Sequence, residues 1–174
     1  MRMRLVLPLL MLSGISIALA EPLATQADEV LIVRNHHDQR FWKEGSPAKK
    51  LKQPVYPKDL ALAGVSGCVA IGFYIEPDGS TSNYRVLLSH IGDSRSGKIG
   101  KKDKRAIISM FGNATVKSLE GIKFEPGTEN PDKQRGFSYT YVSFSTEQLP
   151  LQGTCEIPDL EVFLGNKISS AASK

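Results

Sequence analysis

The sequence predicts a small α+β domain in which a three-stranded antiparallel sheet carries two helices on one face. Three observations support this prediction: apolar side chains alternate along three segments, a turn sequence joins the first two, and a helical pattern separates the second from the third. The 174 residues, of which 41% are hydrophobic and 23% charged, fit one globular domain with extensions. Two large domains are excluded by this length.

The first helix and strand follow Tyr56-Pro57. Because proline suits the first position of a helix, we expect a short helix over residues 58–63 that Gly64 ends. Between residues 65 and 75 the apolar residues recur at every second position, which is typical of a strand with one face in a core.

A turn sequence, Pro77-Asp78-Gly79-Ser80, follows this strand. The next stretch, residues 81–89, is therefore predicted to return as the second strand of a hairpin. Its apolar residues Tyr84, Val86 and Leu88 are expected on one side.

Residues 91–105 are rich in glycine, serine and lysine and predict a mobile loop. From residue 107 to residue 122 apolar residues recur at steps of three and four, which indicates an amphipathic helix. The aromatic stretch 136–146 is predicted to form the third strand. The order helix, strand, strand, helix, strand then gives an antiparallel sheet backed by helices.

The N-terminus has the layout of a secretory signal peptide. Arg2 and Arg4 precede an uncharged run that closes on Ala18-Leu19-Ala20. The run is shorter than the roughly 20 apolar residues of a spanning helix, and Pro8 interrupts it. We expect cleavage after Ala20 and export from the cytoplasm; the alternative is an uncleaved anchor in the inner membrane, which alone would give the chain a membrane contact.

The charge balance argues against nucleic acid as a partner. The chain has 22 basic and 18 acidic residues, a formal charge of +4. Removal of Arg2 and Arg4 with the leader lowers this charge to 20 against 18, or +2. Nucleic-acid binding usually needs a dense basic face.

Export allows the two cysteines, Cys68 and Cys155, to pair in an oxidising compartment. The alternative is two separate thiols. Neither cysteine belongs to a Cys-x-x-Cys motif, which argues against a redox catalyst. No metal site is expected either: His36 and His37 are adjacent and diverge, and a metal needs three or four converging ligands.

No catalytic pattern stands out. The stretch from Gly92 to Lys98 imitates a phosphate-binding loop, but Ile99 follows where a serine or threonine would hold magnesium. Neither a Ser/His/Asp order nor a Cys/His dyad can be identified. We therefore expect a protein that is not an enzyme and has no cofactor; an enzyme would need a pocket around His90 or another general base.

Together, the order of elements and their residues resemble the C-terminal domain of the TonB family over about residues 53–147. The matching residues are Tyr56-Pro57, Gly64-Val65-Ser66-Gly67, Pro77-Asp78-Gly79, Phe111, Ala114, Ser118, Leu119 and Ile122 of the second helix, Phe124-Glu125-Pro126, and Gly136. The resemblance implies a periplasmic domain that grips an extended segment of an outer-membrane receptor. A sheet edge can do so by accepting an added strand.

In the family, the stretch through Tyr-Pro contacts the receptor segment. Here it corresponds to Gln53, Pro54, Val55 and Tyr56, and Tyr139 and Tyr141 of the third strand are further expected contacts. The alternative is that Val55 and Tyr56 only pack the start of the first helix.

The chain then divides into a signal peptide (1–20), an irregular lead-in (21–53), the TonB-like domain (54–147) and a C-terminal tail (148–174). A bridge between Cys68 and Cys155 would draw the tail across the strand face that holds Ala70 and Gly72. The tail residues expected to cover this face are Leu151, Ile157, Leu160, Val162 and Phe163.

Two functions remain open. The first is receptor binding, with or without coupling to the proton-motive force; only 33 residues separate Ala20 from Pro54, a reach of about 110 to 120 Å when fully extended. The second is a structural or assembly factor of the cell envelope, whose sheet edge pairs with a subunit or with a second copy as a homodimer.

Overall fold

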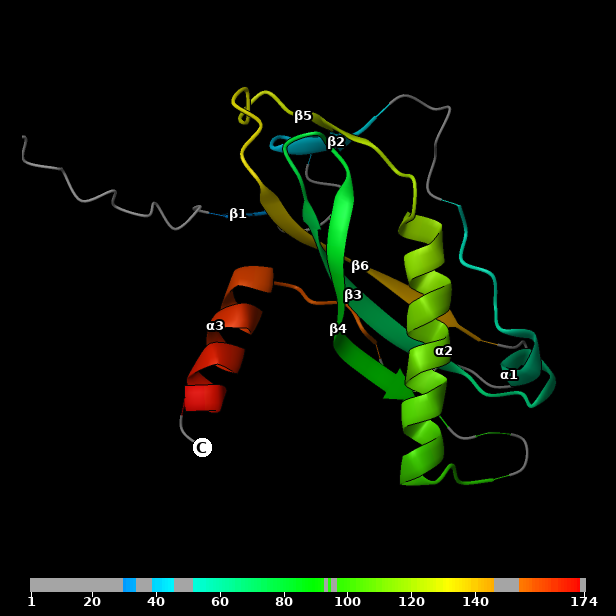
Figure 1. Ribbon diagram of the computed structural model, residues 1–174. Helices are drawn as coiled ribbons and strands as arrows, with labels where there is room; N and C mark the ends of the chain where they lie inside the picture. The colour runs from blue at the N-terminus through cyan, green and yellow to red at the C-terminus, as the bar shows by residue number, and fades with distance from the viewer. Residues whose placement is uncertain are drawn as a thin grey trace, which may run out of the picture.

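The computed structural model describes residues 30–33, 39–45, 52–92, 94, 97–145 and 154–172, with side chains up to residue 166. One sheet has the strand order β1-β6-β3-β4 and a second has the order β2-β5 (Figure 1). The strands are β1 (Leu31–Ile32), β2 (Trp42–Glu44), β3 (Gly67–Ile75), β4 (Thr81–Ile91), β5 (Phe124–Pro126) and β6 (Gly136–Phe144). The helices are α1 (Lys58–Leu62), α2 (Lys101–Leu119) and α3 (Leu160–Ala172).

The α+β class is confirmed, but the prediction of three strands is wrong. The three predicted strands are β3, β4 and β6, which pair antiparallel, and β1 adds a fourth strand parallel to β6. Leu31 donates its N–H to the carbonyl of Arg135 (3.0 Å), and Val33 donates to Phe137 (2.8 Å). A strand of two residues has no measurable alternation, which explains why the sequence pattern missed it.

The lead-in is also more ordered than expected, because β2 pairs antiparallel with β5. Trp42 in β2 is buried, and its indole N–H donates to the carbonyl of Gln134 (3.1 Å). This anchors the lead-in to the chain just before β6.

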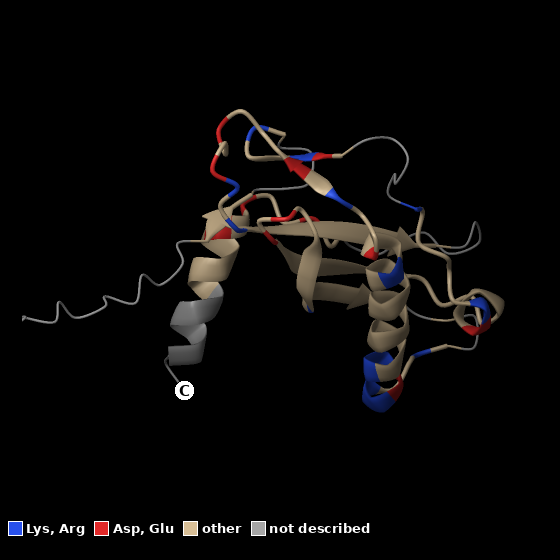
Figure 2. Cartoon of the chain, turned by 45° about the horizontal axis from the view of Figure 1, so that its top comes forward, with Lys and Arg blue, Asp and Glu red and all other residues tan. Residues whose placement is uncertain are grey.

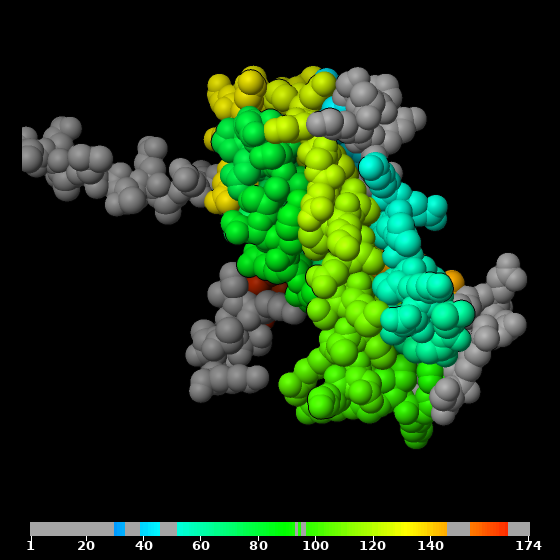
Figure 3. All heavy atoms as spheres, turned by 45° about the vertical axis from the view of Figure 1, so that its right-hand side comes forward, coloured from blue at the N-terminus to red at the C-terminus, as the bar shows by residue number. Residues whose placement is uncertain are grey.

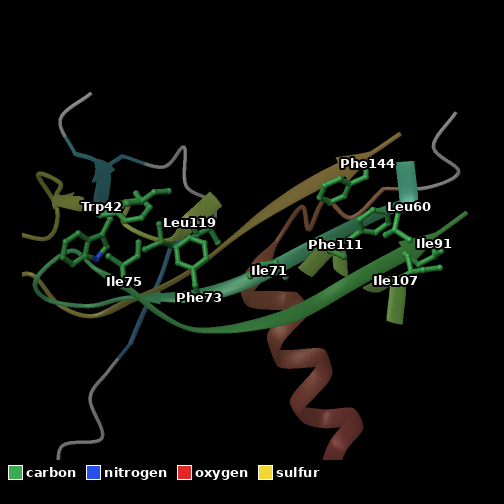
Figure 4. Packing of buried hydrophobic residues seen from close by; sticks show 14 of the residues in the cluster. Trp42, Leu60, Ile71, Phe73, Ile75, Ile91, Ile107, Phe111, Leu119 and Phe144 are labelled. Carbon is green, nitrogen blue, oxygen red and sulfur yellow. The ribbon is translucent and has the colours of Figure 1, made fainter. Parts of the chain in front are cut away.

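One core fills the space between the sheet and the helices α1 and α2. Figure 4 shows Trp42, Ile75 and Leu119 at one end of this core and Phe111 and Phe144 at the other. The rings of Phe111 and Phe144 stack with centroids 4.3 Å apart, and this contact joins the middle of α2 to the end of β6.

Helix α2 begins earlier than the predicted start at residue 107, within the predicted loop 91–105. Its first residues, Lys101 and Lys102, are exposed and contribute nothing to an apolar pattern. Gly100 provides no side-chain cap. The remaining signal of a helix start is Asp103 in the first turn, which is weak on its own.

The expectation that Tyr84, Val86 and Leu88 share one face of β4 is wrong. The register of β3 and β4 shifts so that Ala70 faces Leu88 while the next residue, Ile71, faces Val86. Leu87 is the extra residue of a β-bulge. From this bulge onward, the side chains of β4 alternate between the two sheet faces in the opposite phase. Tyr84 therefore packs in the core under α2, whereas Leu87 and Leu88 pack on the opposite face.

The opposite face is covered by the C-terminal segment, so the prediction of two helices on a single face is incomplete. Cys68 and Cys155 form the predicted disulfide (S–S 2.06 Å), and α3 lies on the other side of the sheet from α2 (Figure 1). Ile157 and Leu160 are buried there and Phe163 packs against them, as expected. Val162 is 57% exposed, which contradicts its predicted place in the cover, and Leu151 lies outside the described residues.

Several N-terminal predictions fall outside the described residues, namely the signal peptide, its cleavage after Ala20, and the pair His36-His37. In the described part of the chain, no helix has the length and apolar character needed to cross a membrane.

Candidate protein-interaction site

The outer edge of β6 presents main-chain groups away from the sheet. The carbonyl of Phe137 accepts a bond from β1, so this residue and every second residue after it point their N–H and C=O groups away from β3. These residues are Tyr139, Tyr141 and Ser143. Among the described residues only β1 pairs with this edge, at Gly136 and Phe137, so the remaining edge is open to a further strand.

The other edge of the sheet, along β4, is less regular. Its pairing with β3 shifts at two places, and Asn83 has a φ of 51°, in the left-handed region. Bulges of this kind twist an edge away from further pairing. The edge of β6 carries no such interruption and is the better template for an added strand.

Tyr139 and Tyr141 were predicted together as contact residues, but the structure separates them. Tyr141 is 41% exposed. Tyr139 is 3% exposed, and its hydroxyl donates to the carbonyl of Ile157 (2.6 Å) and accepts from the N–H of the same residue (3.0 Å). Burial raises the pKa of the Tyr139 hydroxyl. The side chain of Tyr139 thus holds the chain's own C-terminal segment, while its main chain still faces the edge.

Tyr56 is placed in a packing role. Its hydroxyl donates to the carbonyl of Val65, and its ring lies 5.9 Å from that of Phe111 and 5.4 Å from that of Phe144. Burial raises the pKa of this hydroxyl. Val55, by contrast, is 81% exposed, which leaves its side chain accessible to a partner.

A pocket of about 410 Å³ lies between the predicted contact stretch and α2. Figure 3 shows the two walls side by side, with the coil in cyan and α2 in yellow-green. We call this pocket the α2 groove. It is lined by Lys52, Gln53, Pro54, Val55 and Pro57 of the coil and by Met110, Asn113, Ala114, Lys117 and Ser118 of the helix.

The helix wall of this groove was not predicted from the sequence. Met110, Asn113, Ala114 and Lys117 follow one another at steps of three, one and three residues, so they form one stripe along the helix. This stripe lies beside the core stripe that contains Phe111. The spacing could have revealed it, but its mixture of apolar and polar residues hides it in a search for apolar periodicity.

Charge is distributed unevenly along α2. Figure 2 shows basic residues gathered at the foot of the helix, where Lys101, Lys102, Lys104 and Arg105 lie close together with Asp103. This end lies outside the lining of the α2 groove, in which the described charged residues are Lys52 and Lys117.

Groups suited to metal binding do not converge in the part of the chain that the structure describes. No three His, Cys, Asp or Glu side chains there are arranged to hold a metal ion. His90 lies opposite Cys68 in the β3–β4 pair, and that cysteine is bound in the disulfide. In the phosphate-loop-like stretch, Ser94 and Gly97 bond to each other through their main chains (3.1 and 3.2 Å).

Comparison with known proteins gives one family and a set of solved structures. No curated protein matches the chain significantly. The solution structure of the TonB C-terminal domain of Pseudomonas aeruginosa aligns with 19% identity and a TM-score of 0.39, covering 63% of this chain and 90% of that one. The corresponding domain of Helicobacter pylori aligns with 19% identity and a TM-score of 0.36, covering 54% of this chain and 70% of that one.

The family match covers the part of the chain that contains α1, β3 and β4. This part carries several of the residues on which the resemblance was based, from Tyr56-Pro57 to the hairpin turn at Gly79. The resemblance to the TonB family is confirmed, since residues 52–94 match the family of the Gram-negative bacterial TonB protein C-terminal domain.

Proposed function

We propose that this protein is a periplasmic protein-interaction domain that binds an extended segment of an outer-membrane receptor by strand addition at the edge of β6. One observation carries this proposal: β6 has nine residues, and among the described residues its outer edge is paired only at Gly136 and Phe137. The match of residues 52–94 to the TonB family supports the choice of a receptor as the partner.

Strand addition would use the outward main-chain groups of Tyr139, Tyr141 and Ser143. Each such hydrogen bond contributes roughly 0.5 to 1.5 kcal/mol net, so three residues can support a weak and reversible contact. Selectivity would come from side chains near the edge, including Tyr141 and the accessible Val55 and Gln53 of the contact stretch. Pro54 and Tyr56 would hold this stretch in place.

The proposal includes export through cleavage after Ala20 and a mode of action by contact, without catalysis or cofactor. N-terminal sequencing of the mature protein recovered from the periplasm should begin at Glu21. If residues 1–20 are retained in the mature protein, they would instead support an inner-membrane anchor. Coupling to the proton-motive force requires such an anchor.

Amide hydrogen exchange can test the contact itself. The probes are synthetic peptides that copy the periplasm-facing segments of outer-membrane receptors of the host bacterium. A bound strand should slow exchange at Tyr139, Tyr141 and Ser143, while Ser138, Thr140 and Val142 stay unchanged because they already bond to β3. Strand addition would be contradicted if exchange slowed equally at all six amides. It would also be contradicted if exchange slowed at none of them at any peptide concentration.

The same experiment separates receptor binding from the alternative, a structural or assembly factor of the envelope. If the edge of β6 pairs with a second copy, the alternating protection should appear without peptide and grow with protein concentration. If the slowed amide exchange depends on the peptide concentration and not on the protein concentration, the result supports receptor binding.

A further inference from the structure

We infer that the α2 groove is a second contact for the same partner and holds an acidic, apolar stretch next to the segment that pairs with β6. This inference rests on the proposed strand addition and adds to it the chemistry of the residues that flank the paired segment. It follows from the lining of the groove, from its charge and from its position at the end of β6.

The groove suits recognition through side chains. Val55, Met110 and Ala114 give it an apolar surface, and Val55 is 81% exposed when the groove is empty. Covering this surface removes apolar area from water, which favours binding. Pro54 and Pro57 stiffen the coil wall and offer no N–H groups, which makes this wall a poor template for strand pairing. A volume of about 410 Å³ is within the range of ligand pockets.

The charge of the groove selects the partner. Among the residues that the structure describes, its lining contains Lys52 and Lys117 and no acidic residue. Figures 1 and 3 show that residues 52–57 run along α2 in the opposite direction to the helix. Lys52 and Lys117 therefore lie at the same end of the groove, where their positive charges attract carboxylates. The apolar part of the groove lies at the opposite end.

The groove lies near the C-terminal end of β6. Tyr56, between Val55 and Pro57 of the coil wall, and Phe111, next to Met110 on the helix, both pack against Phe144, the last residue of β6. A segment that pairs along β6 and leaves it at Phe144 therefore reaches the apolar end of the groove first and the two lysines after it. This continuity favours a flanking stretch of the paired partner over an unrelated ligand.

Fluorescence anisotropy with three labelled peptides tests the inference. The first contains only a pairing segment from an outer-membrane receptor, the second adds two leucines and two glutamates on the side that leaves β6 at Phe144, and the third replaces the glutamates with lysines. We expect the second peptide to bind tightest, the third to gain less than the second, and the advantage of the second over the third to shrink in high salt.

Charge reversal identifies the site. Lys117→Glu and Lys52→Glu should each weaken the second peptide by roughly two- to fivefold, as expected for one exposed charge pair, and should leave the first unchanged. Lys101→Glu is the matched control, because this exposed lysine lies on the same helix but outside the groove. Equal affinities of the first and second peptides, or equal effects of Lys117→Glu and Lys101→Glu, would overturn the inference.

The failure of strand addition can be recognised separately. A fourth peptide that contains only the flanking stretch should bind weakly and depend on Lys117, even if no receptor segment protects the β6 amides. If the groove is instead filled by a second copy of the chain, the methyl resonance of Met110 should shift with protein concentration alone. That result would also overturn the inference.

Discussion

Gly79 occupies the point where the turn between β3 and β4 meets β5. Its φ is +78°, and a Cβ atom there would lie 2.0 Å from the carbonyl oxygen of Phe124. Phe124 also donates its N–H to the carbonyl of Gly79 (2.8 Å), so the two main chains cannot separate without losing this bond. We expect Gly79→Ala to lower the free energy of unfolding by roughly 2 to 4 kcal/mol, measured by urea denaturation.

Gly121 is the matched control for this substitution. Its φ of +81° is nearly the same, but a Cβ atom there would meet nothing within 4 Å. Gly121→Ala should therefore cost only the strain of the left-handed conformation, about 1 kcal/mol. Equal losses in the two variants would show that the close approach to Phe124 contributes nothing.

Glu76 forms a charge-assisted contact at the start of the same turn. It accepts a hydrogen bond from Arg135 (2.8 Å) and another from the hydroxyl of Ser82. The hydrogen bond from Arg135, followed by that from Ser82, lowers the pKa of Glu76 below its ordinary 4.5. A lowered pKa stabilises the fold at pH values above 4.5, and this contribution is lost as the pH falls through the pKa of the folded state.

Glu76→Gln should therefore destabilise the protein at pH 7 by roughly 0.5 to 1.5 kcal/mol. The difference from the wild type should shrink in acid as Glu76 becomes protonated; urea denaturation at pH 7 and pH 3 measures it. Glu125→Gln is a suitable control because the pair of Glu125 with Lys43 is exposed (3.7 Å) and should contribute little at either pH. A loss that is the same at both pH values would contradict the role of the Glu76 charge.

The C-terminal segment is fastened to β6 by the side chain of Tyr139 and to β3 by the disulfide of Cys68. Tyr139 bonds to both main-chain groups of Ile157 through its hydroxyl. Tyr139→Phe leaves these buried groups without that partner and should cost roughly 1 to 3 kcal/mol. Urea denaturation should show this loss, and hydrogen exchange should accelerate at the Ile157 amide.

Tyr141→Phe provides the comparison, because Tyr141 is 41% exposed and lies two residues further along the same strand. We expect this variant to keep the wild-type stability within about 0.5 kcal/mol. If both variants lose the same stability, the bonds to Ile157 are not what holds the segment.

The strands with clear alternation could be predicted from the sequence, and the shorter ones could not. In β3 the buried apolar residues at every second position fill the core under α2, so the pattern and the structure agree. β1, β2 and β5 have two or three residues each and are defined by their partners rather than by any pattern of their own. The bulge at Leu87 escaped prediction because it reverses the alternation within a continuous strand.

The candidate site was predicted only in part for a related reason. The stretch Gln53–Tyr56 was found through the resemblance to a family, whereas the opposite wall of the α2 groove mixes Met110 and Ala114 with Asn113 and Lys117. Such a stripe resembles an ordinary solvent-exposed helix face until a neighbouring segment lies beside it. Tyr139 and Tyr141 alternate with the core residues of β6, but only the position of the C-terminal segment decides which of the two is buried.

The whole molecule leaves the sheet few ways to meet a partner. Helices α1 and α2 cover one face, and the disulfide-bound C-terminal segment covers part of the other. In the described part of the chain, the accessible main-chain groups of the sheet lie along its two edges, and the edge of β4 is interrupted by bulges. Because one face is covered and the other is covered in part, this arrangement favours the proposed recognition at the edge of β6 and in the α2 groove beside it.

This arrangement predicts that the disulfide supports the fold without contributing to the edge itself. The bond closes a loop of 87 residues, so the chain-entropy model gives a loss of roughly 4 to 5 kcal/mol for the double variant Cys68→Ala/Cys155→Ala. Without the bond, the C-terminal segment should also separate more readily from the second face, where both cysteines, Ala70 and Leu160 are buried. Binding of a hydrophobic dye should increase accordingly.

The core under α2 contains neither cysteine, so β6 should remain paired with β3 in this variant and its outer amides should stay available. A receptor peptide should then still slow exchange at Tyr141 and Ser143 in the double variant, provided the protein is assayed at a temperature below its lowered unfolding midpoint. If peptide protection disappears while far-ultraviolet circular dichroism shows the fold intact, the covered face and the edge act as one unit. Partner binding would then depend on the C-terminal segment as well.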